Sequence, residues 1–119
     1  MNNKEIKNGE ERPWGYYENI FDTKGYKVKH ICVYPKKRLS LQTHEHRSEH
    51  WVITMGTGIV QVGGDTLTLT ENQHVYIPKK TLHRIENPGD SNLYFTETQI
   101  GDYLGEDDIK RYQDDFGRT

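Results

Sequence analysis

The sequence predicts an all-β domain of the jelly-roll or sandwich type. Its 119 residues include no alanine, whereas threonine, isoleucine, valine and tyrosine are abundant, and this composition favours pleated strands over helices. Short segments of β-type residues follow one another along the chain, and turns rich in Gly, Pro, Asn and Asp separate them,. Many short strands with frequent turns are typical of closed or double-sheet β architectures.

The expected strands cover most of the chain. The stretch 63–65, Gly-Gly-Asp, predicts a tight hairpin, because such turns require positive φ angles,. Only residues 105–112 have helical features, since acidic side chains come first and basic ones later, which suits the helix dipole,. We therefore expect a short C-terminal helix there. The expected strands are 14–21, 26–34, 38–44, 49–56, 58–64, 66–70, 74–78, 82–87 and 93–99.

The length of the chain suits one domain, which we place at residues 12–119 after a flexible segment, 1–11,. A formal charge of −2 gives no reason to expect nucleic acid as a partner,. The single cysteine, Cys32, fits a reducing compartment,. The first residues lack the apolar stretch of a signal peptide, and no run of about 20 apolar residues occurs,. We therefore expect a cytoplasmic protein with no membrane partner.

The stretch 39–51, LSLQTHEHRSEHW, concentrates residues that can bind a metal. Alternate side chains of a strand share a face, so Gln42 and His44 point the same way, and Glu49 lies on the bulky apolar face of its strand. His83 is in line with apolar residues of its own segment. Burying these four groups without partners would cost on the order of 1–3 kcal/mol each. A metal ion bound by all four would remove this cost.

The spacing of these residues resembles the two motifs of the cupins, G-x5-H-x-H-x3,4-E-x6-G and G-x5-P-x-G-x2-H-x3-N. The resemblance implies a double-stranded β-helix, that is, a jelly-roll barrel. It also implies the metal ligands Gln42, His44, Glu49 and His83, because the adjacent pair His44 and His46 leaves too few residues before Glu49. In this sequence the motifs become Lys36-x5-Gln42-x-His44-x4-Glu49-x6-Gly56 and Asn72-x5-Pro78-x-Lys80-x2-His83-x3-Asn87.

Three motif glycines are replaced here, by Lys36, Asn72 and Lys80. Asparagine adopts a left-handed turn readily, whereas the two lysines would be strained if their φ angles must be positive. The ligand set also bears on the metal. With an amide oxygen and one carboxylate as ligands, a Zn²⁺ ion keeps a net charge near +1 and remains a strong Lewis acid. Zinc is therefore the expected cofactor, although other divalent ions are possible.

A closer resemblance runs from Arg12 to Arg118. The segments RPWGYYE, SLQTHEHRSEHW and YLGEDDI are similar to the C-terminal cupin domain of type II mannose-6-phosphate isomerases. This resemblance implies metal-dependent interconversion of mannose 6-phosphate and fructose 6-phosphate, which supplies mannose for polysaccharide synthesis. The Gly-rich loop of a guanylyltransferase domain does not occur in the sequence, so we expect no nucleotidyl transfer. Because an uncovered sheet edge invites pairing, we expect a homodimer.

Other polar residues are candidates for catalysis and substrate binding. Glu97 lies on an apolar strand face, so we expect it to act either as the catalytic base or as a clamp on a ligand histidine. Lys29 also faces inward by alternation, unless it is an exposed strand lysine. Phosphate requires cations, which basic turns beside the metal motifs can supply. The expected substrate-binding residues are Arg38, Arg47, Lys80 and Arg84.

Two other functions are compatible with the sequence. One is a non-catalytic cupin that binds a sugar phosphate, because a fold and a pocket do not guarantee turnover. The other is a cupin that acts on another phosphorylated or nucleotide-linked sugar. The complete set of metal ligands favours the isomerase over the first, since a binding module would not need it. Gln42 and the segment SEHW favour the isomerase over the second, because sugar-nucleotide epimerases work without a metal, through a histidine base.

Overall fold

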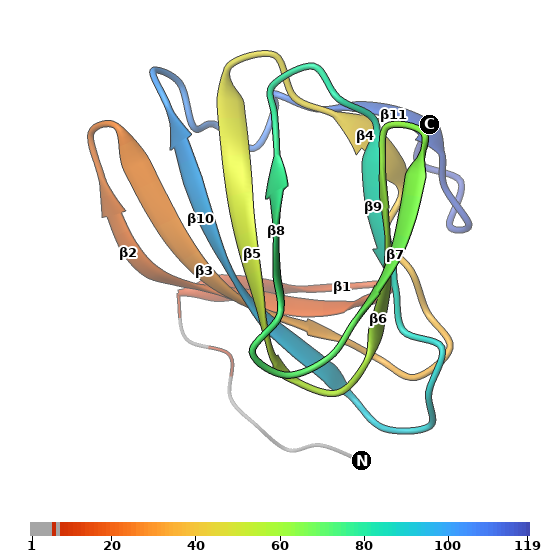
Figure 1. Ribbon diagram of the computed structural model, residues 1–119. Coiled ribbons are helices and arrows are strands. Elements are labelled where there is room, and N and C mark those ends of the chain that lie inside the picture. Colours follow the sequence, from red (N-terminus) through yellow and green to blue (C-terminus); the bar gives the residue numbers. More distant parts are fainter. Residues whose placement is uncertain (1–5, 7) are drawn as a thin grey trace.

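The computed structural model describes residues 6 and 8–119, which form two antiparallel β-sheets that face each other (Figure 1). The six-stranded sheet has the order β1-β2-β3-β10-β5-β8, and the five-stranded sheet has the order β11-β4-β9-β6-β7. The strands are β1 Gly9–Arg12, β2 Gly15–Thr23, β3 Tyr26–Val33, β4 Leu41–Thr43, β5 Arg47–Met55, β6 Gly58–Val62, β7 Asp65–Leu69, β8 His74–Ile77, β9 His83–Glu86, β10 Leu93–Gly101 and β11 Lys110–Gln113.

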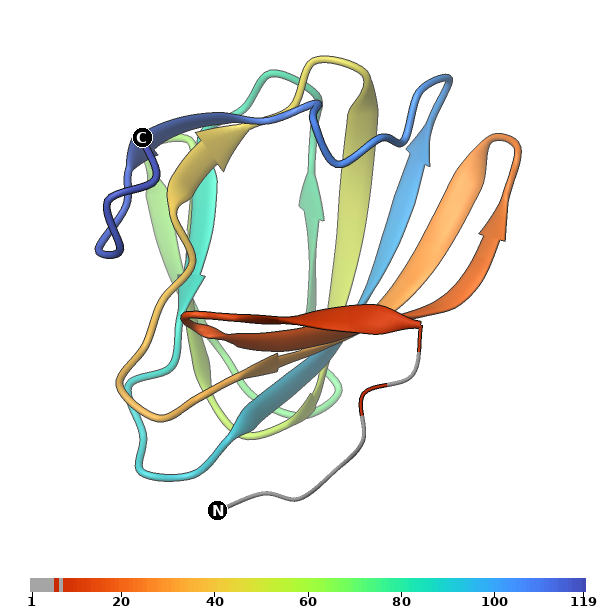
Figure 2. The ribbon, with the colours of Figure 1, turned by 180° about the vertical axis from the view of Figure 1, so that it is seen from behind.

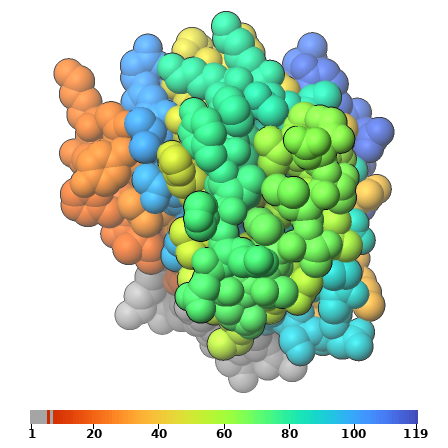
Figure 3. All heavy atoms as spheres, viewed as in Figure 1, coloured from red at the N-terminus to blue at the C-terminus, as the bar shows by residue number. Residues whose placement is uncertain are grey.

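The core lies between the two sheets and follows from the alternation of side chains along the strands. On β5, Glu49, Trp51 and Ile53 are buried whereas Val52 is exposed. The Trp51 ring packs against Phe95 of β10 with 5.0 Å between ring centroids. In the ribbon a gap separates β7 from β8, but side chains of both strands cover this face in Figure 3. Aromatic and β-branched residues therefore fill one part of the barrel, and polar residues line another.

The expected all-β jelly-roll architecture is confirmed, and each of the nine expected strands has a counterpart. The hairpin is present as well. Val62 pairs with Asp65, so Gly63 and Gly64 form a two-residue loop, and Gly63 has a φ of 57°. Two further strands, β1 and β11, were not expected from the sequence. Seen from behind, β1 reaches from the first sheet towards the second (Figure 2).

The expected C-terminal helix at 105–112 is wrong. Residues 106 and 107 form a turn within an irregular stretch, and β11 then pairs antiparallel with β4, with Lys110 opposite Thr43. The acidic side chains are used elsewhere, because Glu106 forms an ion pair with Lys29, and Asp108 accepts hydrogen bonds from backbone N–H groups of the β4–β5 loop. These distant partners outweigh the weak dipole preference on which the helix was predicted. No described segment forms a helix that could cross a membrane.

The N-terminal boundary also differs from expectation. Strand β1 pairs with β2 from Gly9 to Arg12, so the boundary expected at residue 12 falls inside a strand. The rest of the expected flexible segment lies largely outside the described residues, since 1–5 and 7 are not described. Strands β1 and β8 form the edges of the larger sheet. The homodimer remains a prediction.

The three residues at motif glycine positions all have positive φ angles. The values are 64° for Lys36, 72° for Asn72 and 60° for Lys80. The backbone N–H of Lys80 donates to the carbonyl of His44, at 2.8 Å. The left-handed conformation of Lys80 therefore helps to join the loop before β9 to the segment that carries His44, and the side chain remains exposed.

Replacing Lys80 by glycine should stabilise the protein. A non-glycine residue in the left-handed region costs about 1–2 kcal/mol, and the greater freedom of glycine in the unfolded chain offsets about 0.5–1 kcal/mol of that. We expect Lys80→Gly to raise the free energy of unfolding by up to about 1 kcal/mol, measured by denaturant titration. Lys79→Gly is the matched control, since Lys79 has a negative φ, and it should lower stability. A loss of stability in both variants would show that the left-handed conformation of Lys80 is not strained.

Candidate metal centre

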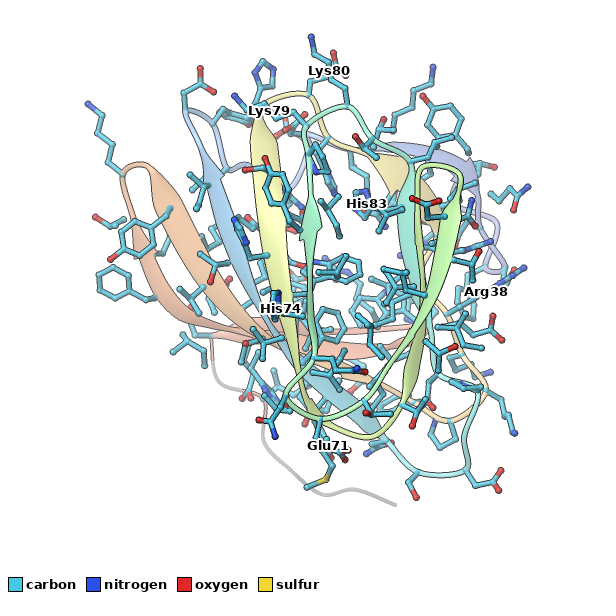
Figure 4. The ribbon with its side chains drawn as sticks, in the orientation of Figure 1. Arg38, Glu71, His74, Lys79, Lys80 and His83 are labelled. Atoms are coloured by element: carbon cyan, nitrogen blue, oxygen red, sulfur yellow. The ribbon has the colours of Figure 1, made fainter. Side chains whose placement is uncertain are left out.

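Three buried residues from both sheets form a cluster that can hold a metal ion. His44 follows β4, Glu49 lies on β5 and His83 begins β9, and one ligand atom of each lies within 4.8 Å of the others. All three side chains are nearly inaccessible to solvent. Figure 4 shows His83 pointing into the space between the sheets. The fold therefore brings together three of the four ligands expected from the sequence.

Backbone carbonyls set the orientation of both imidazoles. His44 Nδ1 lies 2.6 Å from the carbonyl oxygen of Asp108, and His83 Nδ1 lies 2.9 Å from that of Thr81. A carbonyl only accepts hydrogen bonds, so each Nδ1 carries the proton and each Nε2 is an acceptor. Metal-binding histidines are usually oriented in this way.

The atoms that converge in the cluster are acceptors, and this requires a positive charge among them. His44 Nε2 lies 3.2 Å from Glu49 Oε2. A neutral imidazole acceptor and a carboxylate oxygen repel each other at that distance unless a cation or a donor is shared between them. This donor set therefore fits a divalent metal ion, which binds to deprotonated histidine nitrogen and carboxylate oxygen.

The protonation states are those that a metal requires. Burial lowers the pKa of His44 to about 4, and burial also lowers the pKa of His83. Burial alone would raise the pKa of Glu49, but the charge of Arg47, together with the neighbouring histidines, lowers it to about 2. Both imidazoles are thus neutral and the carboxyl group is ionised at neutral pH, so an ion can bind without first displacing protons.

Gln42 lies beside the cluster, directly opposite His83 across the β4–β9 pair. Its amide nitrogen donates to the carbonyl and to the hydroxyl of Ser40, at 3.2 and 3.0 Å. The amide oxygen is therefore the atom left for the cavity that Gln42 lines. In contrast, His46 and His50 are exposed.

Arg47 is part of the cluster and was expected instead to bind substrate. Its Nε donates to Glu49 Oε2 at 2.8 Å, and its Nη2 lies 3.3 Å from His44 Nε2. The indole N–H of Trp51 donates to the other Glu49 oxygen, at 2.8 Å. The buried guanidinium therefore balances the charge of Glu49 and supplies part of the positive charge that the acceptors need.

Glu97 and Lys29 both point inward, as expected, and both line the same cavity. Burial, reinforced by the charge of Glu49, raises the pKa of Glu97 to about 8. The side chain of Gln99 donates a hydrogen bond to Glu97. Because backbone carbonyls occupy Nδ1 of both ligand histidines, Glu97 is not needed as their clamp. Lys29 forms an ion pair with Glu106 at 2.7 Å.

The C-terminal segment supports the centre in a way that the sequence analysis missed. The Asp108 carboxylate accepts the backbone N–H groups of Glu45 and His46, at 3.0 and 2.9 Å, and its carbonyl orients His44. The available signal was the conspicuous segment YLGEDDI, which overlaps the predicted helix at 105–112. The cavity-lining residues that were not expected include Arg12, Tyr17, Glu106, Arg111 and Arg118.

The cavity has a volume of about 110 Å³ and extends from the cluster along the inner wall of the barrel. Arg84 lines it, but Arg38 and Lys80, which were expected to bind substrate, do not. Arg38 forms an ion pair with Asp115 at 2.8 Å. Figure 4 shows Arg38 on the outer side of the molecule and Lys80 at the tip of a loop. Nearness in sequence to the ligands did not place either residue in the cavity.

Solved structures of other proteins have a similar fold. A cupin-2 domain from Rhodospirillum rubrum superposes with a TM-score of 0.67, at 23% identity, over 78% of this chain and 67% of that chain. The capsular polysaccharide assembling protein CapF of Staphylococcus aureus gives a TM-score of 0.72, at 17% identity, over 88% of this chain and 34% of that chain. These likenesses show that the chain has the cupin fold.

The chain belongs to the family described as mannose-6-phosphate isomerase C-terminal, whose model matches residues 1–114. The alginate biosynthesis protein AlgA of Pseudomonas aeruginosa is 51% identical over 91% of this chain and 22% of its own length. A mannose-1-phosphate guanylyltransferase of Salmonella montevideo is 48% identical over 91% of this chain and 23% of its own length. The chain therefore spans less than a quarter of the length of these relatives.

Removing the Asp108 carboxylate should weaken metal binding. Without it the β4–β5 loop loses two backbone hydrogen bonds and the carbonyl that orients His44 is less firmly held. We expect Asp108→Ala to lower zinc affinity about 10–100-fold, as is usual for groups that orient ligands, measured by competition with a chelating dye. Asp107→Ala, at an exposed neighbouring carboxylate, is the control. Equal affinities for the two variants would contradict this role.

Glu97 should make stability depend on pH. Its pKa is about 8 in the folded chain and 4.5 ordinarily, so its contribution is complete below about pH 4.5 and is lost as the pH rises towards 8. Glu97→Gln mimics the protonated form and removes this loss. We measure the difference in melting temperature between the variant and the unmodified protein, with chelator present. We expect this difference to change in favour of the variant as the pH rises from 5 to 8.5. A constant difference across that range would show that Glu97 is already ionised.

Proposed function

We propose that this chain is a metal-dependent isomerase domain that interconverts mannose 6-phosphate and fructose 6-phosphate. The observation that carries the proposal is the buried His44, Glu49 and His83 cluster, with both imidazoles oriented for metal binding, in a member of the mannose-6-phosphate isomerase C-terminal family. Relatives named for alginate, xanthan and mannose-1-phosphate metabolism support a role in supplying mannose for polysaccharides.

The proposed ligands are His44, Glu49, His83 and the amide oxygen of Gln42, and the proposed ion is Zn²⁺. An ion held by these residues would stabilise negative charge that develops on oxygens of the sugar. Gln42 fits because its nitrogen is held by Ser40 and its neighbour across the sheet is His83. Arg47, hydrogen-bonded to Glu49, keeps the charge of the carboxylate balanced.

The isomerisation moves a proton between carbons 1 and 2 through an enediol, and Glu97 is the proposed group that carries it. Its pKa of about 8 lies near the working pH, where a carboxyl group can both accept and return a proton. Such a group contributes about 10²–10⁴-fold to the rate. Lys29 lies on the same inner wall, next to Glu97 across the β3–β10 pair, and its charge favours the ionised form of Glu97.

A coupled assay of mannose 6-phosphate conversion to fructose 6-phosphate tests the proposal. We expect turnover by the zinc-loaded chain, loss of turnover in excess chelator, and recovery when zinc is restored. His83→Ala should lower kcat/KM at least ~10²-fold and release zinc, as measured by metal analysis. His50→Ala, at an exposed histidine, should change neither quantity.

Turnover that persists in chelator and in His83→Ala would refute the metal mechanism. No turnover of any hexose phosphate by the zinc-loaded chain would instead favour a sugar-phosphate-binding cupin. Conversion of another phosphorylated or nucleotide-linked sugar would move the proposal to that substrate. A cytoplasmic location and a homodimer belong to the same proposal and remain predictions.

A further inference from the structure

The cavity has an excess of positive charge that its own carboxyl groups do not balance. Six cationic side chains and three carboxyl groups line it among the described residues. Lys29 pairs with Glu106 and Arg47 with Glu49 inside the cavity. The remaining lining cations are therefore available to an anion unless residues outside the cavity neutralise them. They are Arg12, Arg84, Arg111 and Arg118.

Three of these four cations have partners elsewhere. Arg12 forms an ion pair with Glu10, and Arg118 forms two hydrogen bonds to the Asp114 carboxylate, at 2.8 and 2.9 Å. Arg84 donates to the carbonyl of Leu39 and to the side chain of Gln113. Arg84 and Arg111 both lack a carboxylate within ion-pair distance among the described residues, and each has one buried nitrogen without a partner, Nη2 of Arg84 and Nε of Arg111. Arg111 differs from Arg84 because its guanidinium forms no hydrogen bond with the described part of the chain, whereas Arg84 forms two.

Neighbouring positive charges raise the free-energy cost of holding Arg111 in its charged form without a partner. Burial lowers its pKa, and the charges of Arg118 and Arg12 lower it further, with only Asp114 acting in the opposite direction. In Figure 2 strand β1, which ends at Arg12, runs towards the second sheet, to which β11 belongs. All three guanidinium groups belong to the wall of the cavity, and the charges of Arg12 and Arg118 act on Arg111. A buried donor without a partner in a native fold requires an explanation.

The pairing of the strands shows how far Arg111 lies from the metal centre. Arg111 pairs with Gln42 on β4, and Gln42 pairs in turn with His83 on β9. Adjacent strands lie about 4.8 Å apart, so the Cα atoms of Arg111 and His83 are separated by about 10 Å. Arg111 therefore lines the same cavity at a distance from the metal ligands and does not belong to their cluster. A sugar whose carbons 1 and 2 lie at the ligands would extend its far end towards this wall.

We propose that Arg111, with Arg12 and Arg118 beside it, forms a subsite that binds the phosphate group of a phosphorylated sugar. This inference rests on the proposed function for the position of the sugar. Phosphate suits the site because its oxygens are acceptors and the forked guanidinium can bind two of them at once. The basic turns near Arg38 and Lys80, which the sequence suggested for this role, lie outside the cavity.

Titration calorimetry on the full chain tests the subsite directly. Inorganic phosphate, mannose 6-phosphate and mannose are the three probes, and all solutions contain chelator so that phosphate cannot bind through a metal. We expect mannose 6-phosphate to bind more tightly than inorganic phosphate, and mannose to bind least. Arg111→Gln should weaken binding of both phosphates about tenfold or more, as for the loss of a charged hydrogen bond. The binding of mannose should not change.

Two further variants keep the result interpretable. Arg38→Gln is the matched control, since Arg38 is an arginine outside the cavity, and it should change phosphate affinity less than twofold. Arg111→Lys keeps the charge but loses the fork, so its affinity should lie between those of the unmodified chain and Arg111→Gln. If Arg111→Gln fails to fold, as judged by circular dichroism, Arg111→Lys must still bind phosphate more weakly than Arg38→Gln.

The outcomes separate the subsite from the isomerase. The subsite is overturned if the unmodified chain binds no phosphate at millimolar concentrations. It is also overturned if Arg111→Gln binds phosphate as well as Arg38→Gln does, even where turnover of mannose 6-phosphate is intact. Phosphate binding that depends on Arg111, in a chain that turns over no hexose phosphate, would instead retain the subsite and overturn the proposed reaction.

Discussion

The centre of this structure depends on one buried carboxylate. Glu49 is almost fully inaccessible, and an ionised carboxylate in such a place is tolerated only when opposite charge and hydrogen bonds surround it. Arg47 and Trp51 provide the hydrogen bonds, and two neutral imidazoles face the same point. Removing one partner from a buried pair of this kind typically costs about 3–5 kcal/mol. The charge of Glu49 therefore explains why Arg47, and a metal ion in the proposed function, lie at this place.

The two sheets are joined chemically as well as by packing. Glu49 comes from the larger sheet and His83 from the smaller one, while His44 lies on the connection between them. The short strand β11 then ties the C-terminal segment to β4, so that Asp108 holds the loop that carries His44. Because these contacts join residues far apart in sequence, the geometry of the centre exists only when both sheets are assembled.

Much of the site could be predicted because strand periodicity is a local property. The inward direction of Glu49, Glu97 and Lys29 followed from alternation alone, and the structure agrees. The positive φ angles of Lys36 and Lys80 likewise fit positions where the motif has glycine. These predictions needed no information about distant parts of the chain.

The incorrect predictions concern residues whose positions are set by contacts with residues far away in the sequence. The acidic run at 105–112 has helical charge order, yet Asp108 bonds to residues more than 60 positions away. Arg38 lies near the ligands in sequence, but Asp115, 77 positions away, holds it outside the cavity. Arg111 could not be singled out from the sequence, because its neighbours Arg12 and Arg118 come from opposite ends of the chain. No local sequence pattern indicates that these arginines act on one another in the fold.

The carbonyls that orient the two imidazoles have a consequence for how this centre can change during evolution. Thr81 and Asp108 hold the rings through main-chain oxygens, which every amino acid possesses. A point substitution at Thr81 thus leaves the acceptor for His83 in place, whereas a one-residue insertion or deletion nearby would shift the oxygen away from the ring. The centre should accordingly accept drift in residue identity at Thr81 but resist changes in loop length there.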